Sequence, residues 1–138
     1  MKAIPDTAPR RRVLVVDDSL DAVHSMALLL KMMGHDVQFA INGLAAIDVA
    51  RSFHPDVILL DLGLPDIGGD QLARQWRFEP GLERMRIIAI TGCSDDAARR
   101  RAEAAGCETV LVKPIEASVL EPLLSGAAKP ARGAQARS

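Results

Sequence analysis

Residues 57–69 read VILLDLGLPDIGG, and this stretch decides the fold of the chain. Its first four residues, Val57 to Leu60, are all apolar, which is typical of a strand buried on both faces of a sheet. The run ends in the acidic residue Asp61, and the glycines and proline that follow indicate a loop. The segment therefore predicts a central strand whose carboxyl end carries a carboxylate.

Similar short apolar runs recur along the chain and alternate with segments of helical periodicity. Gly34 and Gly106 stand where the C-terminal caps of two of these helices belong. We expect strands at 13–16, 36–40, 57–60, 87–90 and 110–112, and helices at 20–33, 44–53, 71–78, 95–105 and 117–124. Five strands alternating with five helices predict right-handed βαβ crossovers and a doubly wound α/β sandwich, with a mainly parallel sheet covered on both faces.

Length and composition fit one ordinary globular domain. The chain has 138 residues and a net charge of -1, which argues against a dedicated nucleic-acid binder. We expect a flexible N-terminal tail at 1–11, a domain at 12–125 and a disordered C-terminal tail at 126–138. The sequence shows no signal peptide and no apolar run near the ~20 residues of a membrane span, so we expect a cytoplasmic protein. Cys93 and Cys107 lack metal-ligand spacing and are expected to be reduced thiols.

Polar residues follow the carboxyl ends of four of the predicted strands. They are Asp17 and Asp18 after the first, Asp61 after the third, Thr91 after the fourth and Lys113 after the fifth. In open α/β sheets, the ligand site lies beyond these strand ends. Each residue alone is a weak signal, because an Asp pair at a strand end is usually a helix cap or a solvated turn. Their common location predicts one site.

The residue types of this site suit phosphoryl transfer. Three crowded carboxylates repel one another and need a cation, and Mg²⁺ prefers oxygen ligands. Carboxylates are established nucleophiles that form aspartyl phosphates. Lys113 would add a second positive charge, and the Thr91 hydroxyl would donate a hydrogen bond to a phosphoryl oxygen. The pattern therefore indicates that Asp61 takes a phosphoryl group beside a bound divalent cation.

The segments VLVVDDS, VILLDLGLPDIGG, IIAITG and VLVKP resemble the response-regulator receiver family in order and in spacing. The resemblance covers about residues 12–125. It implies a flavodoxin-like sheet of five parallel strands in the order 2-1-3-4-5. It also implies a signalling domain of a two-component or phosphorelay pathway that catalyses only its own phosphorylation and slow dephosphorylation, rather than an enzyme acting on other substrates.

The resemblance assigns a role to each site residue. Asp17, Asp18, a carboxylate oxygen of Asp61 and the backbone carbonyl of Gly63 would bind Mg²⁺ or Mn²⁺. Asp61 would be the phosphoacceptor, and Thr91 and Lys113 would hold the phosphoryl oxygens. The phosphodonor would be a phosphohistidine on a sensor histidine kinase or a histidine phosphotransfer domain. The choice of kinase would depend on the first helix and on the loop after the fifth strand.

Two positions depart from the family pattern. The family carries an aromatic residue three positions before the lysine, where this chain has Val110, so the usual Thr-aromatic switch cannot operate. We interpret this as favouring a relay or phosphate-sink role. Pro122 lies inside the last predicted helix, where we expect a kink or a short helix. The side chain of Trp76, the only tryptophan, is expected to be partly buried and to serve packing.

Several functions remain open at this level. We favour a single-domain signalling protein, because only a tail follows Leu124 in this sequence. A degenerate receiver acting as a phosphorylation-independent docking module is the main alternative. An aspartyl-phosphate phosphatase would need a second acid that the stretch 61–65 lacks, and a nucleotide or flavin binder would need a glycine motif that the chain lacks. Oligomeric state and downstream partner remain open.

Overall fold

The computed structural model describes residues 10–92 and 95–125. The strands are β1 Arg12–Val16, β2 Asp36–Ala40, β3 Val57–Asp61, β4 Arg86–Thr91 and β5 Thr109–Val112. The helices are α1 Leu20–Met32, α2 Gly43–Phe53, α3 Gly69–Arg77, α4 Asp96–Ala104 and α5 Ala117–Ser125. Every predicted element is present, with its ends moved by at most two residues.

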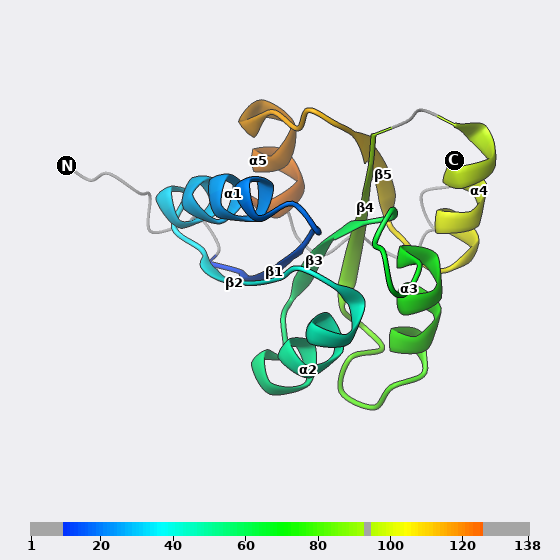
Figure 1. Cartoon of the computed structure of the whole chain (residues 1–138). Coiled ribbons are helices and arrows are strands. Elements are labelled where there is room, and N and C mark those ends of the chain that lie inside the picture. Colours follow the sequence, from blue (N-terminus) through cyan, green and yellow to red (C-terminus); the bar gives the residue numbers. More distant parts are fainter. Residues whose placement is uncertain (1–9, 93–94, 126–138) are drawn as a thin grey trace.

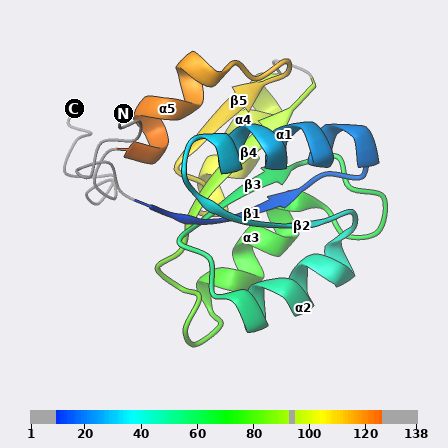
Figure 2. The same ribbon diagram turned by 90° about the vertical axis from the view of Figure 1, so that its left-hand side faces the viewer.

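The five strands form one parallel sheet in the order β2-β1-β3-β4-β5 (Figure 1), as predicted. Helices α1 and α5 cover one face of this sheet and α2 and α3 the other (Figure 2), and α4 lies on the same side as α3 (Figure 1). Each face has its own apolar core, because side chains alternate along each strand: Val13 and Val15 point to one layer, and Leu14 and Val16 to the other. All five residues of β3 are buried, as expected of the central strand.

Helix α3 begins two residues earlier than the sequence pattern indicated. Gly69 is buried at its first position, where an added β-carbon would lie 2.8 Å from the backbone oxygen of Asp61. The chain therefore turns from β3 into α3 at very close range, which only glycine allows. The sequence pattern placed the glycine pair at 68–69 in a loop, whereas in the structure the helix starts there.

Two further expectations concern packing. Trp76 is 1% exposed and lies in the core beneath α2, α3 and α4, so the prediction of partial burial was wrong.

Helix α5 is short, with nine residues that include Pro122, and this confirms one of the two forms expected for it. Its last carbonyl groups are bound from outside the helix: Arg86 Nη2 donates to the Leu123 oxygen and Arg11 Nε to the Leu124 oxygen. The expected tails, and Cys93, lie outside the described residues apart from Arg10 and Arg11.

Candidate phosphoacceptor and cation site

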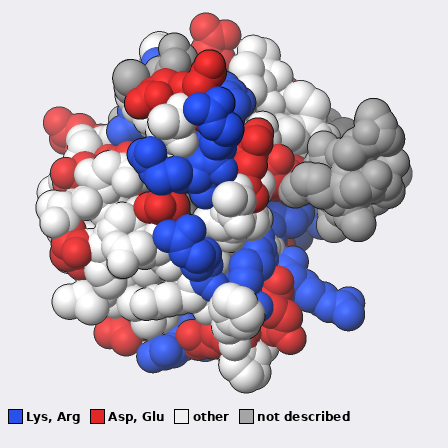
Figure 3. All heavy atoms as spheres, turned by 90° about the vertical axis from the view of Figure 1, so that its right-hand side faces the viewer, with Lys and Arg blue, Asp and Glu red and all other residues white. Residues whose placement is uncertain are grey.

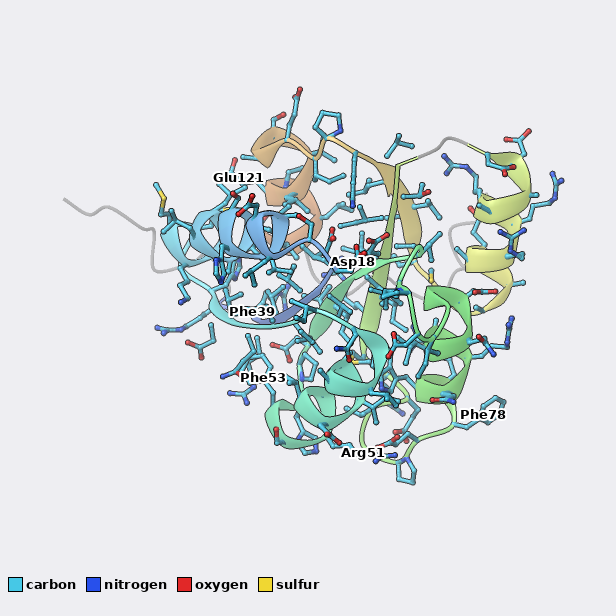
Figure 4. All side chains as sticks on the ribbon, in the orientation of Figure 1. Asp18, Phe39, Arg51, Phe53, Phe78 and Glu121 are labelled. Atoms are coloured by element: carbon cyan, nitrogen blue, oxygen red, sulfur yellow. The ribbon has the colours of Figure 1, made fainter. Side chains whose placement is uncertain are left out.

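The sheet brings the predicted site residues to its carboxyl edge. Asp61 and Thr91 are the last residues of β3 and β4, while Asp17 and Lys113 directly follow β1 and β5. Backbone hydrogen bonds fix these ends, since the Asp17 amide donates to the Ala40 oxygen and the Lys113 amide to the Thr91 oxygen. Figure 4 labels Asp18 near the tip of β1, at this edge. These residues therefore lie at one edge of the sheet, as its parallel topology predicts.

Three carboxylates meet at this edge. Asp17, Asp18 and Asp61 each offer an oxygen, and the three oxygens lie within 4.8 Å of one another. Asp17 and Asp61 are each only 6% exposed, whereas Asp18 is exposed. Buried carboxylates at this spacing repel, and an all-oxygen donor set with one open side suits a hard divalent cation that keeps part of its water shell. The donor chemistry of the cluster thus fits a divalent cation.

Lys113 supplies a positive charge to this cluster. Its Nζ lies 3.0 Å from Asp17 Oδ2 and 3.6 Å from Asp61 Oδ2. Burial lowers the pKa of Lys113, but the Asp17 hydrogen bond and the charges of Asp61 and Asp17 outweigh it, so that the pKa is raised. Lys113 therefore stays charged. The peptide bond between Lys113 and Pro114 is cis.

The Asp61 carboxylate is held in one orientation by the loop that follows it. The Gly63 amide donates to Asp61 Oδ1 at 2.9 Å. Burial raises the pKa of Asp61; the Gly63 hydrogen bond and Lys113 oppose this shift, and Asp17 and Asp18 add to it. The second oxygen, Oδ2, faces Lys113. One oxygen is thus used for orientation, and the other lies beside the positive charge that phosphoryl transfer requires.

Most of the predicted site residues lie together in the structure. Asp17, Asp18, Asp61 and Lys113 form one cluster, and Gly63 contacts it through its amide. The roles of the Gly63 carbonyl and of the Thr91 hydroxyl stay predictions. Val110 is buried in the apolar core on the α4 side of the sheet.

One contact near the site escaped the sequence analysis. Asp66, in the loop after β3, accepts hydrogen bonds from the first amides of α2. A proline-aspartate pair signals a turn. It does not reveal that the aspartate binds a helix more than 20 positions earlier in the chain.

A cleft of about 540 Å³ opens beside the cluster, between α1 and the loop after β5. Asp17 and Lys113 line its polar end, and Met26, Leu59 and Ile90 belong to its apolar wall. The small residue Ala22 on α1 leaves room for it. The cleft therefore lies at the carboxyl edge of the sheet, where ligands of doubly wound folds bind.

The fold and the acidic edge together define a phosphoacceptor signalling domain of the doubly wound α/β class. The chain belongs to the response regulator receiver domain family, whose model matches residues 13–125. It is a phosphoacceptor response regulator. Among the described residues, no helix combines the length and the apolar character that crossing a membrane would require.

Relatives and solved structures agree with this assignment. The polar-differentiation response regulator DivK of Brucella ovis is 30% identical over 105 residues, which are 76% of this chain and 85% of that protein. The chemotaxis protein CheY4 of Vibrio cholerae superimposes with a TM-score of 0.79 at 26% identity, covering 84% of this chain and 97% of that one. A CheY-like receiver domain from Methylobacillus flagellatus gives 0.76 at 28% identity, with the same coverage.

Proposed function

We propose that Asp61 accepts a phosphoryl group from a phosphohistidine of a sensor histidine kinase or a histidine phosphotransfer domain. A carboxylate oxygen of Asp61 forms a bond to phosphorus, the bond from phosphorus to the histidine nitrogen breaks, and that nitrogen leaves with the electron pair. Lys113 and Thr91 hold the phosphoryl oxygens during the transfer. The single observation that carries the proposal is the position of Lys113 Nζ, 3.0 Å from Asp17 and 3.6 Å from Asp61.

Asp17, Asp18, Asp61 and the backbone carbonyl of Gly63 would hold Mg²⁺ or Mn²⁺. When bound, the cation would offset the carboxylate charges and neutralise charge on the transferring group. The chain's own residues orient Asp61 through Gly63 and supply Lys113 as the second positive charge. Water would later attack the phosphorus, the bond from phosphorus to the Asp61 oxygen would break, and inorganic phosphate and the free Asp61 carboxylate would form slowly. The protein would thus catalyse only its own phosphorylation and dephosphorylation.

The phosphodonor would dock on α1 and the loop after β5. Leu20, Leu28 and Met32 on the outer side of α1 are 52%, 62% and 71% exposed. Three large apolar side chains exposed on one surface helix favour a partner that covers them. The cleft beside Lys113 adjoins the same helix. A partner seated there would reach Asp61 from the open side of the site.

A relay or phosphate-sink role fits the absence of an aromatic switch. Val110 is buried and aliphatic, so it supports no ring movement between two states. Basic side chains over α3 and α4 are interspersed with acidic ones (Figure 3), which argues against a nucleic-acid partner. We place the protein in the cytoplasm, where its phosphodonors act. The receiver domain that carries this role would span residues 12–125.

Incubation with acetyl phosphate and Mg²⁺, followed by measurement of intact mass, tests the proposal. The wild type gains one phosphoryl mass, and Asp61→Asn gains none because the nucleophilic oxygen is lost. Asp48→Asn is the matched control, since Asp48 is an exposed acid of α2 outside the site. It gains the same mass as the wild type.

Other outcomes would contradict the proposal in different ways. A gain of mass in Asp61→Asn would show that another residue is the acceptor. No gain in the wild type, together with no binding of Mg²⁺, would favour the docking module. Phosphorylation at full rate in the presence of a chelator would show that the reaction needs no divalent cation.

A further inference from the structure

The loop between β3 and α3, residues 62–68, is fixed to a helix that precedes it in the chain. The Asp66 carboxylate reaches the N-terminus of α2, where Oδ1 accepts from the Gly43 amide at 2.8 Å and Oδ2 from the Leu44 amide at 3.0 Å. Oδ1 also accepts from the Ile67 amide at 2.9 Å. These bonds lower the pKa of Asp66, with the Gly43 bond contributing most. The carboxylate thus joins two segments that the sequence separates by more than 20 residues.

The contact between α2 and this loop is tight. Gly43 is buried, and a β-carbon there would lie 2.9 Å from Cβ of Ile67 and 3.2 Å from Oδ1 of Asp66. No larger residue fits without moving the loop. The start of α2 and the loop therefore approach each other so closely at position 43 that only glycine fits there.

Helix α2 does not need Asp66 as its N-cap. Asn42 already fills that position, and its side chain accepts from the Ala45 amide at 2.8 Å. Asp66 adds a negative charge at the positive end of the helix dipole. It also accepts hydrogen bonds from the Gly43 and Leu44 amides, which the Asn42 side chain does not bind. The cap belongs to the helix, whereas the Asp66 bonds hold the loop to the helix.

The held loop is the one that carries Gly63. At its start, the Gly63 amide binds Asp61, and at its end the Gly69 amide donates to the Leu62 oxygen at 3.4 Å. Asp66 is the attachment between these two points. We propose that Asp66 is a positioning residue of the cation site, which sets the direction of the Gly63 carbonyl by clamping the loop to the N-terminus of α2. This inference rests on the proposed cation site and goes beyond it.

Calorimetric titration of the full chain with Mg²⁺ tests the clamp. Partners that orient metal ligands typically change metal affinity by 10-fold to 100-fold when lost, so we expect Asp66→Ala to raise the Kd for Mg²⁺ about 10-fold. Asp66→Asn keeps one oxygen acceptor and should fall between Asp66→Ala and the wild type. Asn42→Ala is the matched control: it also removes a hydrogen bond at the N-terminus of α2, but it leaves the loop attached, and its Kd should stay within about twofold of the wild type.

Amide hydrogen exchange without Mg²⁺ gives a second readout that does not depend on the bound cation. In Asp66→Ala, the amides of Gly43, Leu44 and Gly63 should exchange faster, whereas in Asn42→Ala the amide of Gly63 should stay protected. Equal Mg²⁺ affinity in wild type and Asp66→Ala would overturn the clamp alone. So would equal weakening by Asn42→Ala, because the effect would then come from α2 as a whole. A wild type that binds no Mg²⁺ would overturn the cation site and the clamp together.

Discussion

The two edges of the sheet bury charged side chains in opposite ways. At the amino edge, Arg86 and Glu108 form an ion pair of 2.7 Å with side chains only 9% and 7% exposed, and two nitrogens of Arg86 bind the two oxygens of Glu108. At the carboxyl edge, the described residues include three clustered carboxylates, and the Lys113 ammonium group pairs with two of them, Asp17 and Asp61. The first cluster is balanced within the chain. The second has excess negative charge, which a ligand from outside would have to balance.

The largest expected effect comes from breaking the balanced pair. Arg86→Met leaves Glu108 buried without its partner, and removing one partner of a buried pair costs about 3–5 kcal/mol. We expect this loss in the free energy of unfolding, measured by urea denaturation. The Mg²⁺ affinity should not change, because the pair lies at the opposite edge from the acidic cluster.

The double variant Arg86→Met/Glu108→Leu is the control for that result. It replaces both charges with apolar groups, which often restores the stability that a single replacement removes. Stability that stays as low in the double variant as in Arg86→Met would show that the loss comes from packing rather than from the unpaired charge.

An intermediate effect is expected from Lys113→Met. Among the described residues, Lys113 is the only cationic side chain that forms ion pairs with the acidic cluster. Loss of one charge-stabilising donor in an active site typically costs 10²-fold to 10³-fold in rate. We expect phosphorylation by acetyl phosphate to slow about 100-fold, as followed by intact mass over time. Lys31→Met, on the exposed side of α1, is a matched control and should react at the wild-type rate. If the Lys113→Met variant were phosphorylated as fast as the wild type, Lys113 would have no role in phosphoryl transfer.

A smaller effect concerns stability and pH. Burial, with Asp17 and Asp18, raises the pKa of Asp61 above its usual 3.8. The folded state therefore holds the Asp61 proton more tightly than the unfolded chain. The stability this contributes is fully present below the unfolded pKa and is lost as pH rises through the folded pKa. At neutral pH without Mg²⁺, the ionised Asp61 should thus lower stability.

Asp61→Asn should consequently be more stable than the wild type at pH 7 without divalent cations, by about 1 kcal/mol, a size common for single substitutions. The difference should shrink as the pH falls toward 3.8 and as Mg²⁺ is added to the wild type. Paired thermal denaturation curves at several pH values measure it. A variant less stable than the wild type at pH 7 would mean that Lys113 already balances the cluster.

The sheet and most of the site could be predicted because their signals are local. Runs such as Val57–Leu60 reveal a buried strand, and each site residue stands at or next to the end of such a run. Parallel topology then gathers residues that are far apart in sequence at one edge. Asp17, Asp61 and Lys113 could therefore be assigned to one site without any knowledge of distances.

The contacts that escaped prediction are the ones made between loops and distant elements. Nothing local connects Asp66 with Gly43, or Arg86 with Glu108, since each pair is separated by more than 20 residues and lies where elements meet. The full burial of Trp76 also depends on how three helices pack together. Such contacts follow from tertiary packing, which periodicity and turn signals do not describe.

Chemical mapping of the phosphorylated residue tests the central claim most directly. The protein is phosphorylated with acetyl phosphate and Mg²⁺ and reduced with borohydride, which converts an acyl phosphate to an alcohol, and its peptides are then sequenced by mass spectrometry. If Asp61 is the acceptor, homoserine appears at position 61 and nowhere else. Homoserine at Asp17 or Asp18, with position 61 unchanged, would contradict the role given to Asp61 at this edge of the sheet.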